Sequence, residues 1–140
     1  MFWDSSAVVP TILRMRSSRE LTSLLGSDAR PGIWWATPVE CQSALFRRHC
    51  ERPLPADAVE QALGRLTALV EDAYVIAPTL VLRERAGRLL RAHPLRAADA
   101  LQLAAAIAWS DDAPRGEPFV CLDDRLREAA HREGFAVLPE

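Results

Sequence analysis

The sequence predicts an α/β fold built around a central, mostly parallel sheet. Short apolar runs alternate with longer helical patterns along its 140 residues, as in repeated strand–helix units. Acidic residues stand where the apolar runs end or the helical patterns begin, and open α/β sheets form their ligand sites at that edge. A chain of this length buries about two-thirds of its unfolded surface, so we expect a single domain over residues 1–140.

The first two strands flank a pair of short helices. A strand is expected at 1–4, followed by helices at 6–13 and 18–25. Gly26 is expected to stop the second helix, because glycine favours the end of a helix over its interior. The apolar run at 33–36 predicts the second strand.

The middle of the chain predicts two helices and a third strand. Pro38 stands at the first position of a helix at 37–50, where its missing N–H leaves no helical hydrogen bond unmade. Apolar residues at helical spacing predict an amphipathic helix at 56–72. The apolar run at 74–76 predicts a strand that Pro78 ends.

The remaining elements continue the same alternation. Pro94 separates the next two helices, and Gly134 is placed to cap the last one. In order, we expect a helix at 80–92, a helix at 96–109, a strand at 119–122, a helix at 123–133 and a strand at 135–138.

Four acids stand at these strand ends and helix starts. They are Asp4, Glu40, Asp99 and Asp123. Carboxylate oxygens are the ligands that hard divalent cations such as Mg²⁺ and Mn²⁺ prefer. If the fold brings the four together, they form a metal site of the kind that phosphodiesterases use.

Each acid also has a purely structural explanation. Asp4 is placed to cap the helix that follows the first strand, and either Asp123 or Asp124 is placed to cap the last helix. Thr37 to Glu40 follow the S/T-x-x-E capping-box pattern.

The setting of Asp99 favours function over capping. Its helix is apolar nearly all round and is expected to be largely buried. A carboxylate in the first turn is favoured by the helix dipole. A buried one, however, needs a hydrogen-bond partner, an ion pair or a metal.

Composition argues against several other function classes. All 17 basic residues are arginine, so neither a P-loop nor a lysine-assisted phospho-acceptor domain can work here in its usual form. No G-x-S-x-G elbow supports an α/β-hydrolase mechanism. A formal net charge of −2 is not the basic field of a simple nucleic-acid-binding protein, but a nuclease can obtain local positive charge from its metal.

Cysteine usage and the chain start indicate a cytoplasmic protein. The three cysteines are odd in number and form no C-x-x-C pair, so neither a disulfide framework nor a zinc site is expected. The first residues lack a signal-peptide pattern, and no apolar run is long enough to span a membrane. A reducing setting without membrane contact fits these features.

The order and spacing of the acidic segments resemble those of the PIN-domain nuclease family, in particular the VapC toxins of type II toxin–antitoxin modules. The resemblance spans the whole chain and implies one PIN-like three-layer α/β/α sandwich over residues 1–140. Its third and fourth segments are the most specific. The segments that carry it are residues 2–7, 37–41, 95–104 and 119–130.

The resemblance implies a ribonuclease that hydrolyses RNA phosphodiester bonds with Mg²⁺ or Mn²⁺. Carried over by the resemblance, the family's metal-binding acids fall on Asp4, Glu40, Asp99 and Asp123. Of these we expect Asp4, Asp99 and Asp123 to bind the metal directly. We expect Glu40 to make a water-mediated metal contact or to position the nucleophile. The resemblance also implies a homodimer and a cognate antitoxin. One departure is Cys121, two positions before the last of these acids, where many members have a small hydroxyl residue.

The residues that grip the substrate are less distinctive. We expect Ser5 to contribute a hydroxyl beside the metal site, and Arg96 to contact a phosphate, with Arg14 and Arg16 as a weaker pair. The tryptophans are expected in the core and the histidines at the surface. The apolar face of the first two helices suits either the domain's own core or an antitoxin segment.

One alternative function is left open by the sequence. The chain is also compatible with a PIN-like RNA- or protein-binding regulatory module that has little catalysis, which its near-neutral charge and Cys121 favour. The RNA target, the antitoxin and the number of metal ions are not specified by the sequence.

Overall fold

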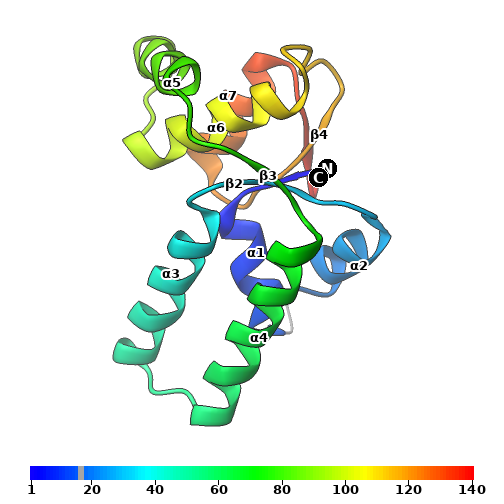
Figure 1. Cartoon of the computed structure of the whole chain (residues 1–140), viewed down its shortest axis with the longest axis vertical. Helices are drawn as coiled ribbons and strands as arrows, with labels where there is room; N and C mark the ends of the chain where they lie inside the picture. Colours follow the sequence, from blue (N-terminus) through cyan, green and yellow to red (C-terminus); the bar gives the residue numbers. More distant parts are fainter. Residues whose placement is uncertain (16–17) are drawn as a thin grey trace.

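The predicted alternation of strands and helices is present in the computed structural model, which describes residues 1–15 and 18–140 (Figure 1). The strands are β1 (Phe2–Trp3), β2 (Gly32–Trp34), β3 (Tyr74–Ile76), β4 (Pro118–Val120) and β5 (Ala136–Leu138). The helices are α1 (Ser5–Ile12), α2 (Arg19–Ser27), α3 (Thr37–Glu51), α4 (Ala56–Asp72), α5 (Leu80–Ala92), α6 (Ala97–Trp109) and α7 (Asp124–Glu133).

The strands form one sheet in the order β3-β2-β1-β4-β5, and every neighbouring pair is parallel. The chain adds β2 and β3 on one side of β1, then crosses over to add β4 and β5 on the other side. The strand order therefore reverses between β1 and β4. Such a reversal opens a crevice at the carboxyl ends of the two strands, where ligands of open α/β sheets bind.

Both faces of the sheet are covered by helices, which confirms the predicted three-layer sandwich (Figure 1). Successive strand residues point to opposite faces. Phe2 and Phe119 accordingly belong to a core shared with α5, α6 and α7, whereas Trp3 and Val120 belong to a core shared with α1 to α4. Burial on both faces explains why the strands are apolar runs rather than alternating patterns.

The first two helices, α1 and α2, bury most of their apolar side chains in the protein's own core. Val8, Ile12 and Leu21 are at most 3% exposed in the core on that side of the sheet. Val9 and Leu13 are partly buried and pack against the same core. Packing in the domain's own core therefore explains why these side chains are apolar, and a binding surface for an antitoxin segment is not needed to explain them.

Three local predictions need correction. Gly26 lies inside α2, which continues to Ser27. Trp35 follows the end of β2 and is 58% exposed, so it does not pack in the core. His93 is buried rather than at the surface, and its Nε2 lies 2.6 Å from Glu133 Oε1.

Other predictions hold closely. The bounds of α4, β3 and α5 are the predicted ones, and Gly134 caps α7 with a φ of 104°, a left-handed conformation that suits glycine. Within the described part of the chain, no helix is both long enough and apolar enough to cross a membrane.

Candidate active site

All four predicted acids line one open cavity of about 590 Å³. Asp4 and Asp123 reach it from the ends of the adjacent strands β1 and β4, and Glu40 and Asp99 from the first turns of α3 and α6. The cavity thus lies at the carboxyl edge of the sheet, beside the reversal of strand order. Four helices, α1, α3, α6 and α7, begin around it.

Asp4 is the most buried of the four acids, with 4% of its surface exposed. Its Oδ2 accepts a 2.8 Å hydrogen bond from the Ser6 N–H and so caps α1. The predicted capping role is therefore real, but it leaves the carboxylate lining the cavity. Burial raises the pKa of Asp4 above its ordinary value, the hydrogen bonds from Ser6 lower it, and the nearby charge of Glu40 raises it further.

Asp123 is solvent-exposed and lines the same cavity as Asp4, three residues after the end of β4, the strand that pairs with β1. The pairing is extended by the Asp4 N–H, which donates to the Val120 carbonyl at 3.0 Å. Asp123 caps α7, since its Oδ1 accepts from the N–H groups of Arg125 and Leu126 at 3.0 Å each. Asp123, and not Asp124, is the helix cap.

Asp99 is half-buried in the first turn of α6. Its Oδ2 accepts a 3.2 Å hydrogen bond from the Arg96 N–H. Burial raises the pKa of Asp99, as does the nearby charge of Asp123, while the Arg96 hydrogen bond and the charges of Arg96 and Arg125 lower it. The expected deep burial of this acid is not observed, because the apolar, buried part of α6 begins at the next residue, Ala100.

Glu40 does not form the predicted capping box. Ala36 occupies the N-cap position of α3, and Thr37 is already the first helical residue, so its side chain does not cap the helix. Glu40 instead accepts a 2.7 Å hydrogen bond at Oε2 from Nε2 of Gln102 on α6. The same nitrogen donates to Thr37 Oγ1 at 3.2 Å. A tertiary contact has replaced the local pairing that the sequence pattern predicts.

Gln102 was not identified from the sequence. It is 1% exposed, and within residues 1–15 and 18–140 its Oε1 has no hydrogen-bond partner. A buried, unsatisfied amide oxygen costs about 1–3 kcal/mol of stability. The only signal in the sequence was a polar residue in an otherwise apolar helix, three positions after Asp99.

Two buried thiols lie beneath the acids. Cys121 Sγ is 3.7 Å from Asp4 Oδ2 and 3.6 Å from Ser6 Oγ, which also accepts from the Leu122 N–H at 2.9 Å. Burial raises the pKa of Cys121 far above its ordinary value. Burial, reinforced by the charges of Asp4 and Glu40, raises the pKa of Cys41 to about 12. Both thiols are therefore neutral neighbours of the carboxylates.

The donor set fits a hard divalent cation, because the four acids supply only carboxylate oxygen. Asp4 in particular is a buried carboxyl group close to another acid, which a cation would relieve. Among the described residues, however, no three His, Cys, Asp or Glu side chains stand ready to enclose an ion. Each acid is instead held by its own hydrogen bond, described above.

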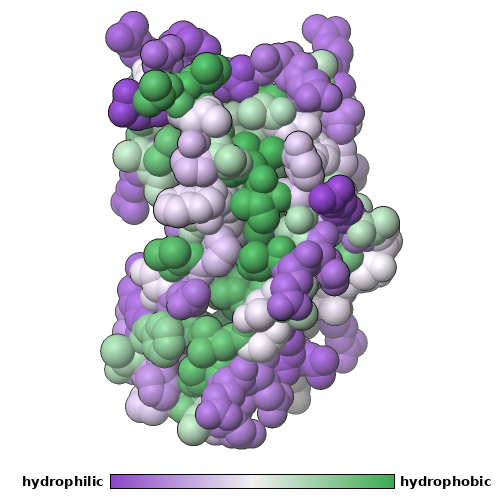
Figure 2. Space-filling model, in the orientation of Figure 1, coloured by the Kyte–Doolittle hydropathy of each residue, from purple (hydrophilic) through white to green (hydrophobic). Residues whose placement is uncertain are grey.

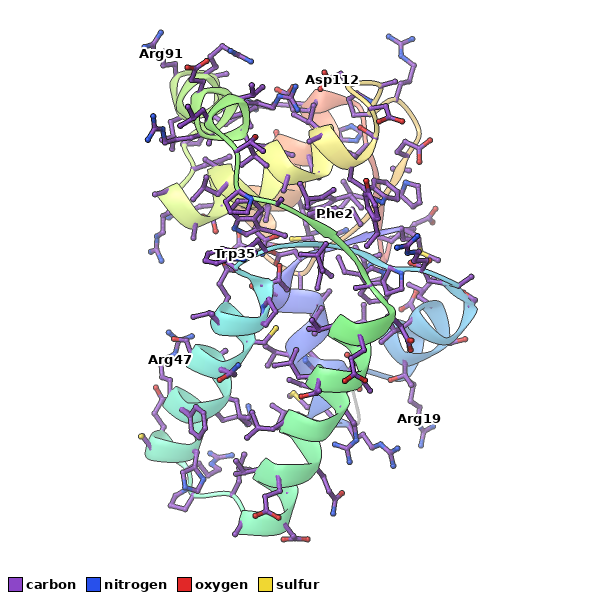
Figure 3. All side chains as sticks on the ribbon, in the orientation of Figure 1. Phe2, Arg19, Trp35, Arg47, Arg91 and Asp112 are labelled. Atoms are coloured by element: carbon purple, nitrogen blue, oxygen red, sulfur yellow. The ribbon has the colours of Figure 1, made fainter. Side chains whose placement is uncertain are left out.

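Arginines lie at both ends of this acidic region. Arg47, seven residues and two helical turns after Glu40, lines the main cavity and projects from α3 (Figure 3). Arg96 and Arg125 line a second cavity of about 270 Å³, which shares Asp99 and Asp123 with the first.

Of the other residues predicted to bind substrate, only Ser5, among those that the structure describes, is found at the site. Ser5 is half-buried and lines the main cavity. Arg14 is exposed and does not line either of these two cavities, and Arg16 lies outside the described residues. Arg47 went unnoticed, although its spacing from Glu40 was readable from the sequence.

Comparison with known proteins identifies the family. No family model matches the chain. Ribonuclease VapC45 and Ribonuclease VapC49, each from a strain of Mycobacterium tuberculosis, are both 30% identical to it over 148 aligned positions, which cover 99% of this chain and 94% of each relative. A crystal structure of VapBC2 from Rickettsia felis, bound to a DNA fragment from their promoter, matches this chain with a TM-score of 0.62. The match is 15% identical in sequence and covers 97% of this chain and 95% of that one. It supports the fold. The chain therefore belongs to the VapC family of ribonucleases.

Proposed function

We propose that this chain is a Mg²⁺- or Mn²⁺-dependent endoribonuclease that acts as the toxin of a toxin–antitoxin pair. The observation that carries the proposal is the convergence of Asp4, Glu40, Asp99 and Asp123, from four separate segments, on one cavity. Family membership supports the ribonuclease part. The metal, and the role of each acid, are inferred from the chemistry of the donor set.

Three of the acids would hold the metal: Asp4, Asp99 and Asp123. When bound, Mg²⁺ or Mn²⁺ would make a water more acidic and offset the charge on the phosphoryl group. Each of the three is already fixed by a backbone N–H at a helix start, so little side-chain freedom is lost when they take up a ligand.

Glu40 is the residue we assign to the attacking water. Its Oε2 is engaged by Gln102, so Oε1 is the atom that orients the water and accepts its proton. The water oxygen forms a bond to phosphorus, the bond from phosphorus to the leaving sugar oxygen breaks, and the leaving oxygen takes up a proton from solvent.

Positive side chains on either side of the acids would hold the RNA backbone. Arg96, which lines the second cavity, and Arg47, which lines the main one, would contact neighbouring phosphates. Ser5 lines the main cavity next to Asp4 and would donate its hydroxyl to a phosphate oxygen.

The partners follow from the family and from one surface. The Rickettsia felis neighbour is a VapBC complex, and we propose a cognate antitoxin for this chain. Exposed apolar side chains around β3, where Figure 2 shows hydrophobic residues gathered, suit a homodimer. They include Trp35, Tyr74, Val75, Leu80 and Val81. Sedimentation of the purified chain tests this, and a monomer at micromolar concentration would contradict it.

The decisive experiment is cleavage of a structured RNA pool with Mg²⁺ or Mn²⁺, with EDTA, and with Asp4→Asn and Asp99→Asn. We expect EDTA to abolish cleavage and each variant to lose more than about 100-fold, because even outer partners of metal ligands account for 10–100-fold. Asp57→Asn, at an exposed site on α4, is the matched control. Folded wild-type protein that cuts no RNA under any condition would favour the alternative, a regulatory module with little catalysis.

A further inference from the structure

We propose that Gln102 is a positioning residue that aims Glu40 into the cavity and ties it to Asp99. This inference rests on the proposed ribonuclease function. It assigns a role to a side chain that touches neither substrate nor metal and acts only through the carboxylate of Glu40.

The contacts of Gln102 define how it would act. Its single amide nitrogen donates to Glu40 Oε2 at 2.7 Å and to Thr37 Oγ1 at 3.2 Å. These two acceptors stand three residues apart on the first turn of α3, so one side chain holds both the turn and the carboxylate. Because Oε2 is held by Gln102, the other carboxylate oxygen of Glu40, Oε1, is free to bind the attacking water.

Packing alone does not explain an amide at this position. The residues that follow on α6, from Leu103 to Ile107, are apolar and buried. The amide oxygen of Gln102 is buried without a partner in the described part of the chain. A methionine would fill similar space and leave no polar atom unsatisfied. A group kept at the expense of stability indicates a role other than stability.

The placement of Gln102 also links two of the acids. Asp99 stands one helical turn before it on α6, and both Asp99 and Glu40 line the cavity. The separation of these two acids is therefore set by a rigid helical turn and one hydrogen bond, with no loop between them. Small shifts of α6 would move both acids together.

Steady-state kinetics of Gln102→Met test the role. We expect kcat to fall about tenfold with KM changed less than about twofold. Gln102→His keeps an N–H donor at similar reach and is expected to recover most of the turnover. Leu103→Met, at the next buried position of α6, is the control for altered packing and is expected to keep wild-type turnover.

A double-mutant cycle separates positioning from a merely structural role. In the Gln102→Met background, Glu40→Gln is expected to cost much less than it does in the wild type, because the carboxylate is already misplaced. Losses that multiply, or full turnover in Gln102→Met while Glu40→Gln is inactive, would overturn the inference.

A readout independent of catalysis completes the test. In nuclear magnetic resonance spectra, the Gln102 side-chain amide protons are expected to be protected from solvent exchange and to shift strongly in Glu40→Gln. An amide that exchanges freely would refute the contact itself. Wild-type protein that shows the contact but cuts no RNA would instead refute the proposed function, and the positioning role would fall with it.

Discussion

The two sides of the cavity hold their acids in opposite environments. On the inner side, Asp4 is almost fully buried, and Glu40 accepts a hydrogen bond from the buried amide of Gln102. On the outer side, Asp99 and Asp123 are bonded to backbone N–H groups and reach solvent. The sequence pattern treats the four acids as equivalent, but they differ in burial. Burial raises the pKa of both Asp4 and Asp99, and Asp4 is much the more deeply buried of the two. Asp4, on the inner side, therefore has the greatest need of a cation.

Thiol reactivity should show the largest contrast between interior and surface. Cys50 is exposed, while Cys41 and Cys121 are buried beneath the inner side. Burial raises the pKa of Cys41 from 9.0 to about 12, which makes its thiolate roughly a thousandfold scarcer near neutral pH. We expect one thiol per native chain to react with a disulfide reagent, and the other two to react about a thousandfold more slowly or only after unfolding.

One variant serves as a control for that measurement. Cys50→Ser should abolish the fast reaction and leave the slow one unchanged. Fast labelling of Cys121 in the native protein would show that the inner side is open to solvent, and the contrast drawn above would fail.

The second contrast concerns stability without metal. Asparagine caps a helix as well as aspartate, so Asp4→Asn keeps the bond to Ser6 and removes the buried charge. Because burial raises the folded-state pKa of Asp4 above its unfolded value near 3.8, the penalty for its ionised form is absent below that pH. It grows as pH rises and is complete above the folded-state pKa.

Asp4→Asn is therefore expected to stabilise the metal-free protein at neutral pH by about 1–3 kcal/mol, and to lose that advantage in acid. Asp123→Asn, at an exposed cap, should change stability by less than about 0.5 kcal/mol. Urea unfolding in EDTA, near pH 4 and pH 7.5, measures both. Equal effects of the two variants would mean that the two sides do not differ.

The smallest effect is expected from the arginines of the outer side. Loss of one charged phosphate contact costs about 1.5 kcal/mol, or roughly tenfold, so Arg96→Ala should raise KM for RNA about tenfold with little change in kcat. Arg91→Ala, exposed at the end of α5, is the control. The difference should shrink at high salt. A fall in kcat with unchanged KM would instead place Arg96 in the chemical step.

Local sequence patterns predicted the fold well where residues that end helices and strands were clearly placed. α4, β3 and α5 have the expected bounds because prolines and clear apolar periodicity define their ends. The four acids were found because each follows a strand or opens a helix. That they meet depends on the strand order, which the spacing alone leaves open.

Two of the failures, at Glu40 and His93, share a physical cause, the preference for a distant partner over a local one. Glu40 bonds Gln102, 62 positions along the chain, instead of capping its own helix. His93 is buried and bonds Glu133, 40 positions away. No local pattern carries such contacts. Arg47 is a different kind of miss, since its two-turn spacing from Glu40 placed it on the same helix face.

The crossover in the sheet has a consequence for how the protein is made. Asp4 arrives with the first strand and Asp123 with the fourth, which must dock beside the first before the cavity is complete. A chain still emerging from the ribosome holds β1, β2 and β3 but lacks one wall of the site. The proposed nuclease thus gains its site only after β4 has left the ribosome and paired with β1.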